Sequence, residues 1–302
     1  MRFPVEKSFY VDGEKAAYRQ VNDPDPLHVA AELPSYPDLC SDLGEAKALL
    51  GEADWRLVVL AAQAIAERFP AAETPNPKVR VRELWDFICN DLGVEYIGGL
   101  EFKAALAAAG HRIGETEDGE ETVSVPAAVW AAETARRRPY GQDWGFTAAG
   151  VTARWLAPVE VTRARLGSAL LAHGELSALG VEGSASNIHL WRAAQRACRD
   201  LLEDLPARHV QEVVDHLARY YPACDEATEE SPSSYVVKHA VEDALGRYVS
   251  NGELILATLV LGYPTRRDAP NLLIGTPEWV VASRAAYGRS VASARRRERE
   301  AA

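Results

Sequence analysis

The sequence predicts a mainly α fold with a minor β component, in which a module of three helices and a β-hairpin occurs twice in tandem. Three observations predict it. Residues 56–110 recur without a gap at residues 208–262, an offset of 152, with ten identical positions. Both copies place apolar residues at helical spacing in three successive segments. Both then show two short apolar runs around a polar turn, the pattern of a hairpin.

The identical positions include the residues that punctuate structure. Beyond Gly110 the register slips by one, so that Pro126 meets Pro277. The ten positions, numbered in the first copy, are Arg56, Val58, Ala66, Pro70, Ala71, Asp91, Tyr96, Glu101, Ala105 and Gly110.

Residues 1–42 lie ahead of the repeat and predict a β-hairpin followed by an extended arm. The apolar runs at Phe9–Val11 and Ala16–Val21 flank Asp12-Gly13, and this dipeptide favours the positive φ angles of a tight turn. Four prolines between residues 24 and 37 then predict an extended connection.

The first module is predicted to span residues 43–140. Its helix one stops at Pro70, its helix three stops at Gly110, and Pro126 starts a final helix, because proline is tolerated at the first helical position. The predicted elements are helices at 55–69, 82–92 and 100–109, a hairpin at 112–125 and the helix from Pro126.

A helical linker is predicted at residues 141–187, with a helix from Val161 to His173 and a helix cap at Ser184–Asn187. The second module then covers residues 188–302. Its Arg-rich tail is expected to fray. The predicted elements are helices at 210–221, 235–245 and 253–261, a hairpin at 265–275 and a final helix from Pro277.

Three helices followed by a hairpin resemble the winged-helix superfamily in both copies. In the first copy the resemblance rests on residues that look like helix two, the turn, helix three and the start of the wing. They are Leu84 to Cys89, Asp91 to Gly93, Tyr96, Ile97, Glu101, Phe102, Leu106 and Gly110. A generic three-helix module with a hairpin is the alternative. The resemblance implies that helix three enters the DNA major groove and that the hairpin, or wing, contacts the DNA backbone.

Composition and charge restrict the function. The chain of 302 residues is 47% apolar and 25% charged, and it carries a net charge of −11. This composition is typical of a globular protein, and no apolar run approaches the ~20 residues of a membrane span. We therefore expect a cytoplasmic protein with no membrane association. The four cysteines form no CxxC pair, and the sequence predicts neither a metal nor a cofactor.

Duplex DNA is the first predicted partner, although the overall charge repels phosphate. Local clusters of Lys and Arg on the predicted loops, helix ends and wings could still contact it. The predicted DNA contacts are Lys78, Arg80, Arg82, Lys103, Arg112, Arg136, Arg137, Arg138, Arg266 and Arg267. The principal hypothesis is a non-enzymatic, DNA-associated regulatory or accessory protein.

A protein partner is the second hypothesis, and a homo-oligomer is a further possibility. Helix three of the second copy is almost entirely apolar, which predicts packing against another protein through Leu254, Ile255 and Leu259. The first wing is acidic, with five Asp and Glu residues between 115 and 121. The chain would then be an acidic adaptor or assembly subunit. In architecture and charge it resembles the tandem winged-helix subunits that clamp the kleisin of chromosome-condensing complexes.

Enzymatic signals are few, and the sequence predicts no enzyme. His209 and His216 lie seven residues apart, whereas metal ligation on a helix favours a spacing of three or four. A hydrolase-like site is the remaining alternative, because Ser233, Ser234, His239 and Asp243 supply the residue types of acyl transfer. No strained turn of the GxSxG kind presents either serine.

Overall fold

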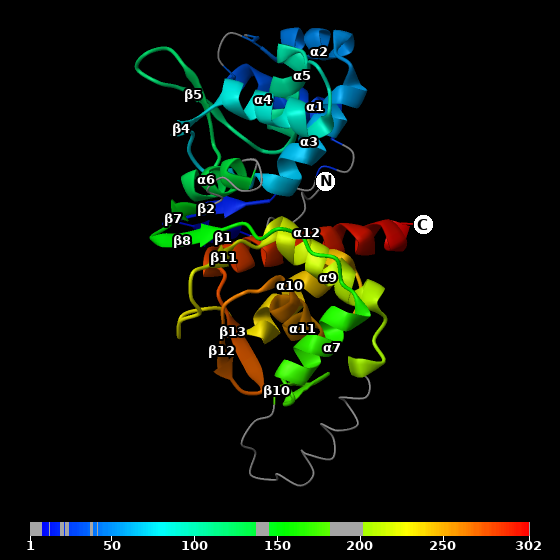
Figure 1. Ribbon diagram of the computed structural model, residues 1–302. Coiled ribbons are helices and arrows are strands. Elements are labelled where there is room, and N and C mark those ends of the chain that lie inside the picture. Colours follow the sequence, from blue (N-terminus) through cyan, green and yellow to red (C-terminus); the bar gives the residue numbers. More distant parts are fainter. Residues whose placement is uncertain are drawn as a thin grey trace. The chain divides into compact units, whose positions relative to one another are not determined.

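The computed structural model describes residues 8–11, 13–18, 21, 24–36, 39–40, 42–136, 145–181 and 202–301. Within these residues the chain is an α+β mixture of eleven α-helices and five small antiparallel sheets. The chain divides into two compact units (Figure 1). The first comprises Met1–Glu133 with Ser293–Ala302, and the second comprises Thr134–Ala292. The β content is larger than the three predicted hairpins.

The first unit begins with a hairpin and surrounds one buried helix. Aspartates cap three of its helices, since the carboxylates of Asp25, Asp42 and Asp54 each accept from backbone N–H groups of the following turn. In chain order its elements are β1 (Ser8–Val11), β2 (Glu14–Ala17), α1 (Pro26–Glu32), a 3₁₀ turn (Leu33–Ser35), α2 (Leu43–Glu52), α3 (Trp55–Arg68), β3 (Ala71–Ala72), β4 (Asn76–Arg80), α4 (Val81–Leu92), α5 (Gly99–Ala108), β5 (Ile113–Glu115), β6 (Glu121–Val123) and α6 (Ala127–Arg136).

The second unit repeats much of this order. Its α7 begins at the cap of Thr162 and its α11 at the cap of Ser250, whose hydroxyl accepts from Glu253 N. Its elements are β7 (Gly145–Ala148), β8 (Val151–Arg154), α7 (Arg163–Ala172), β9 (Leu176–Ser177), β10 (Gly180–Val181), α9 (Ala207–Tyr220), β11 (Ala223–Cys224), α10 (Ser234–Leu245), α11 (Asn251–Leu261), β12 (Thr265–Asp268), β13 (Asn271–Ile274) and α12 (Glu278–Ala301).

The helices and hairpins predicted for both modules are present, with ends that differ by a few residues. Gly110 and Gly262, predicted to end helix three, both take a φ of +81°. Glycine readily adopts this left-handed conformation, so both glycines follow the end of helix three as the sequence predicts. The predicted cap at 184–187 lies outside the described residues.

The predictions about the flanking segments need comparison with the structure. The Arg-rich tail, expected to fray, lies in α12, which is helical to Ala301. The segment 141–187 is not simply a helical linker: it carries the β7–β8 hairpin ahead of its helix, and β8 pairs with β11. The sequence patterns also give no sign of α1, α2 or the β9–β10 hairpin.

The duplication reaches further toward the N-terminus than the sequence predicts. At an offset of 137, β1 matches β7, β2 matches β8 and the start of α1 matches the start of α7. Aromatic pairs mark the equivalence, with ring centroids 5.8 Å apart for Phe9 and Tyr18 and 6.5 Å apart for Phe146 and Trp155. The first hairpin, predicted to lie outside the repeat, is therefore part of it.

Each hairpin is completed by a third strand that follows helix one. In the first unit Ala16 pairs with Ala72, giving the strand order β1-β2-β3. In the second, Ala153 pairs with Cys224, giving β11-β8-β7. The matched register shows that the hairpin and the helical part of each unit form one structural module.

Candidate functional site

Helix three of the first unit is a core helix. The residues of α5 from Ala104 to Ala108 are buried, as is Phe102. Helices α1, α2 and α3 all contact α5, and Figure 1 shows α5 among the other helices of this unit. An α-helix must present an open face to lie in a DNA groove. Hence α5 does not offer the surface that the sequence resemblance implies.

Helix three of the second unit is enclosed even more completely. Leu254 and Ile255 are fully buried, and Leu259 packs against the same core. The surrounding elements include α7, α9, α10, β10 and β13. The prediction that Leu254 and Ile255 face a protein partner needs correction, because the chain's own helices and strands already cover them, whereas Leu259 is partly covered.

The N-terminal end of α11 is closed by the β9–β10 hairpin. Asn251 Nδ2 donates to Leu179 O at 3.4 Å and to Asn271 Oδ1 at 3.1 Å. A Cβ on Gly252 would lie 1.9 Å from Ser177 O, so only glycine allows this approach. The end of helix three that would approach DNA in a helix-turn-helix protein is thus occupied by the protein itself.

Several predicted DNA contacts are committed to ion pairs. Arg80 lies 2.7 Å from Glu120, and Arg266 lies 2.7 Å from Glu229. The Lys103 ammonium donates to Glu121 at 2.6 Å and is largely buried. Each of these cations would have to leave its carboxylate before it could neutralise a phosphate.

The other predicted contacts divide into three groups. Lys78, Arg82 and Arg267 are exposed. Arg112 is exposed and donates to the carbonyl oxygen of Glu73 at 3.2 Å. Arg136 is half-buried, with its guanidinium 6.0 Å from the centre of the Trp155 ring. Residues 137 and 138 lie outside the described part of the chain.

The net charge is carried by one part of the sequence. Residues 1–133 hold 24 of the 44 Asp and Glu residues but only 12 of the 33 Lys and Arg residues, a net charge of −12. The remaining residues have a net charge of +1. Phosphate repulsion therefore acts mainly on the first module, and the second is nearly neutral.

Ser234 and His239 of the hydrolase-like hypothesis do not converge. Ser234 is fully buried, where its hydroxyl donates to Asn251 Oδ1 at 2.9 Å and accepts from Leu272 N. His239 is half-exposed and contacts Glu242 at 2.8 Å, on a different face of α10. A nucleophile and its base must lie within hydrogen-bond reach, and these two residues do not form such a pair.

A tyrosine is exposed at the same place in both units. Tyr96 and Tyr248, one of the ten identical pairs, precede helix three and are 65% and 75% exposed. The Tyr96 ring leans on Trp85, with centroids 5.3 Å apart. Large aromatic side chains that stay exposed are typical of binding surfaces. The sequence marked the identity of these residues but not their exposure.

The surroundings of Tyr248 form a more elaborate cluster. The ammonium of Lys238 lies 5.0 Å from the centre of the Tyr248 ring and 5.6 Å from that of Tyr235, within cation–π range. Lys238 also donates to Glu242 at 2.8 Å. Tyr235 and Val236 are each 52% exposed. The cluster holds two tyrosine rings in place at the surface.

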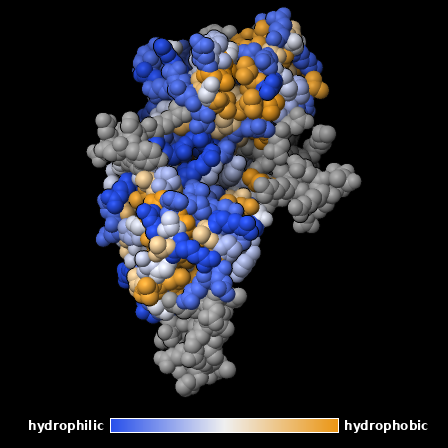
Figure 2. All heavy atoms as spheres, turned by 45° about the vertical axis from the view of Figure 1, so that its right-hand side comes forward, coloured by the Kyte–Doolittle hydropathy of each residue, from blue (hydrophilic) through white to orange (hydrophobic). Residues whose placement is uncertain are grey.

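Apolar surface is also visible on the first unit, the upper one in Figure 2. The large apolar side chains exposed there include Leu27 of α1, Leu43 of α2 and Leu60 of α3. Exposed apolar patches on a folded protein commonly mark sites of association. Of these three helices, the sequence patterns predict only α3.

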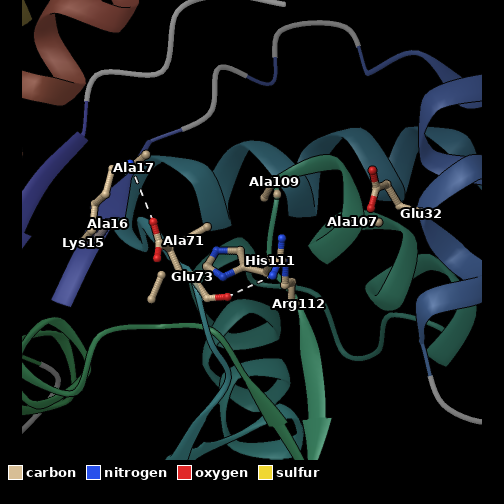
Figure 3. Close-up of a pocket in the computed structure, with 12 residues that line it drawn as sticks. Lys15, Ala16, Ala17, Glu32, Ala71, Glu73, Ala107, Ala109, His111 and Arg112 are labelled. Carbon is tan, nitrogen blue, oxygen red and sulfur yellow. Dashed lines mark hydrogen bonds and ion pairs between the residues drawn. The ribbon is translucent and has the colours of Figure 1, made fainter.

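A cavity of about 240 Å³ lies in the first unit (Figure 3). Its walls come from strands β2 and β3, the end of α5 and the end of α1. His111 lies at its base, with Nδ1 3.2 Å from Ser124 O and Nε2 3.1 Å from Phe69 O. Lys15, Glu32, Glu73 and Arg112 supply charged groups. Of these only Arg112 was predicted as a site residue, for a different role.

A second cavity, of about 440 Å³, lies in the second unit and is acidic. Asp225, Glu226, Glu230 and Glu278 line it, together with Cys224. Burial, followed by the charge of Asp225, raises the pKa of the Cys224 thiol to about 11. This thiol is protonated at neutral pH, so it is a poor nucleophile.

Comparison with protein-family models, with curated proteins and with solved structures finds no match to this chain. In the described part of the chain, no helix has the length and hydropathy needed to cross a membrane. Nor do His, Cys, Asp and Glu side chains gather there in groups of three that could hold a metal ion.

Proposed function

We propose that this chain is a non-enzymatic protein-interaction adaptor built from two winged-helix-like modules, each of which presents a tyrosine at the turn before helix three. The order of three helices and a hairpin supports the winged-helix likeness. The single observation that carries the proposal is the retention of Tyr96 and Tyr248 at matched positions where both are mostly exposed. A buried core does not require either ring.

The surroundings of helix three favour a protein partner over base-specific DNA binding. In winged-helix proteins that bind DNA, helix three occupies the groove, but here α5 and α11 are covered by other elements of their own modules. The turn that carries the tyrosine remains accessible beside each of them. Tyrosine is enriched in interface hot spots, because a rigid ring buries a large area with little loss of entropy.

Site-specific photo-crosslinking in the full-length chain tests the proposal. A photoreactive phenylalanine derivative at position 96 or 248 is expected to give the same discrete protein adduct in cells. Tyr10 is a matched control, because it is 66% exposed and has Thr147 at the equivalent position of the second unit. Adducts from position 10 alone, or from none of the three, would refute the proposal.

The purified partner then allows a quantitative test. Tyr96→Ala and Tyr248→Ala should each weaken its binding about tenfold or more, as expected for truncated hot-spot residues. The free energy of unfolding should change by less than about 0.5 kcal/mol, because neither ring belongs to the core.

DNA association without base reading is the second candidate, and the exposed pair Arg266 and Arg267 on β12 favours it. These residues belong to the nearly neutral second module. Fluorescence anisotropy with a labelled duplex should then show affinity that falls steeply with salt. The double variant Arg266→Glu/Arg267→Glu should abolish it, whereas Glu117→Gln should not reduce it. Affinity that is independent of salt and of both arginines would eliminate this candidate.

A further inference from the structure

We propose that the cavity of the first unit binds a small zwitterionic ligand of the α-amino acid class. The cavity has a polar rim and walls of small side chains, contributed by Ala16, Ala72, Ala107 and Ala109. This site lies apart from the tyrosine surfaces and does not depend on the proposed adaptor function.

The charges around the cavity suit a ligand that carries both signs. Arg112 offers five N–H donors, of which Nη1 alone makes a hydrogen bond within the described residues, to Glu73 O. The Glu32 carboxylate has no ion pair within those residues, and it lies apart from the other charged groups in Figure 3. Arg112 can therefore receive a carboxylate and Glu32 an ammonium group.

Lys15 and Glu73 form an ion pair at the rim of the cavity. Their ion pair spans 3.6 Å between side chains that are 47% and 72% exposed. Pairs of this kind contribute little and exchange readily. A ligand carboxylate at Arg112 can thus take Lys15 as a second cation, since breaking the existing pair costs little.

The size of the cavity limits the ligand. A volume of about 240 Å³ is below the range of about 300–1,000 Å³ that is usual for drug-sized ligands. The walls leave no room for a nucleotide or a peptide. Glycine, alanine and serine, whose two charged groups are only a few bonds apart, match both the volume and the opposed charges.

The second unit shows that the fold alone does not produce this cavity. Where the first unit has Ala107 and Ala109, the second has the larger Leu259 and Leu261. Three of the four charges are absent as well, because Thr152, Ala169 and Pro264 stand at the positions of Lys15, Glu32 and Arg112, and only Glu73 keeps an acidic counterpart, Asp225. Both the space and the opposite charges are therefore properties of the first copy alone.

The base of the cavity is held rigidly. His111 is 3% exposed, and its carbonyl oxygen accepts from the Tyr36 hydroxyl at 2.6 Å. Arg112 follows directly, and its backbone N–H donates to Ser124 Oγ at 2.8 Å. The backbone that carries Arg112 is fixed before any ligand arrives, which reduces the entropy lost on binding.

Titration calorimetry and amide NMR of the full-length chain test the proposal with glycine, L-alanine and L-serine. We expect saturable binding of at least one of them, with shifts at the amides of Ala107, Ala109 and Gly110. The matching methyl ester and the N-acetyl derivative, which each lack one charge, should bind at least tenfold more weakly. The proposal would be overturned if these amides showed no saturable shift with any probe at concentrations up to about 10 mM.

Variants separate this site from adventitious binding. Arg112→Gln and Glu32→Gln should each weaken binding about tenfold, the loss expected for one charge-assisted hydrogen bond. Arg82→Gln, which alters an exposed cation away from the cavity, should bind like the wild type. Ala107→Leu introduces the residue of the second unit and should abolish binding. If that variant does not fold, Lys15→Thr, which also introduces the residue of the second unit, should weaken binding instead. Equal affinity in Arg112→Gln, Glu32→Gln and the wild type would also refute the site.

Discussion

Arg68 and Glu133 form an ion pair inside the first unit, with Nη1 3.4 Å from Oε2 and side chains only 7% and 5% exposed. Arg68 Nη2 also lies 2.8 Å from Asp91. The second unit has Tyr220 and Arg284 at the matched positions, where the guanidinium lies 4.6 Å from the ring centre. The two copies thus hold helix one against the last helix by different chemistry.

The first prediction concerns this pair. Arg68→Met should lower the free energy of unfolding by about 3–5 kcal/mol, because it removes the guanidinium that pairs with the buried Glu133 carboxylate. Urea denaturation followed by circular dichroism measures the loss. Arg80→Met is the control, since its ion pair with Glu120 joins side chains that are 50% and 42% exposed, and its effect should be about 0–1 kcal/mol. Equal losses in the two variants would contradict a structural role for the buried pair.

A second prediction follows from the approach of the β9–β10 hairpin to α11. Gly252→Ala places a methyl group against the Ser177 carbonyl and should destabilise the protein by about 1–3 kcal/mol. Gly51→Ala is the matched control, because a Cβ there meets no atom within 4 Å, and it should stabilise α2 by about 0.5–1 kcal/mol. Thermal unfolding of both variants decides, and a neutral Gly252→Ala would be inconsistent with the contact.

The third prediction concerns Glu242. Burial alone would raise the pKa of this carboxyl, but hydrogen bonds from Lys238 and Val249 N and the Lys238 charge hold it below its ordinary value of 4.5. A depressed carboxyl pKa adds stability that is present above pH 4.5 and is lost as the pH falls through the folded value. Glu242→Gln should therefore destabilise the protein at pH 7, and its difference from the wild type in urea denaturation should shrink as the pH falls below 4.5.

His216 gives a fourth prediction. Burial, followed by the charges of Arg284 and Arg219, lowers the pKa of this imidazole to about 3. Between the ordinary value of 6.5 and this folded value, the unfolded chain binds a proton that the folded chain does not. Stability should fall as the pH drops through that range, by up to about 1.4 kcal/mol per pH unit. His216→Phe should flatten this dependence in urea titrations, and an unchanged slope would rule out His216 as the source.

The strongly periodic helices could be predicted from the sequence almost to the residue. The helix predicted at 82–92 is Val81–Leu92, because its apolar stripe repeats at helical spacing and Gly93 ends it in the left-handed conformation. The counterpart of the first hairpin was missed, since residues 8–18 share only Phe9, Gly13 and Ala16 with residues 145–155. Trp155 stands at the position that matches Tyr18, so the aromatic pair is kept although the residue type differs.

The candidate sites were harder to predict, because they depend on which parts of the chain cover one another. The apolar residues of α11 indicate burial, but the sequence does not say whether another chain or this one supplies the covering surface. Here Leu254 is covered by elements distant in sequence. The cavity depends on the small size of the side chains of Ala107 and Ala109. Comparison with Leu259 and Leu261 could have suggested it only once the copies had been aligned.

The pairing of each early hairpin with the strand after helix one determines where the chain can be divided. A fragment that starts at Arg56, the first matched residue of the repeat, lacks β1, β2 and α1. In this fragment the edge of β3 is unpaired and one face of α5 is exposed to solvent. Unpaired edges invite association with other chains. The hairpin and the helices therefore belong to one structural module, and gene fragments cut at the boundary of sequence identity should yield insoluble protein.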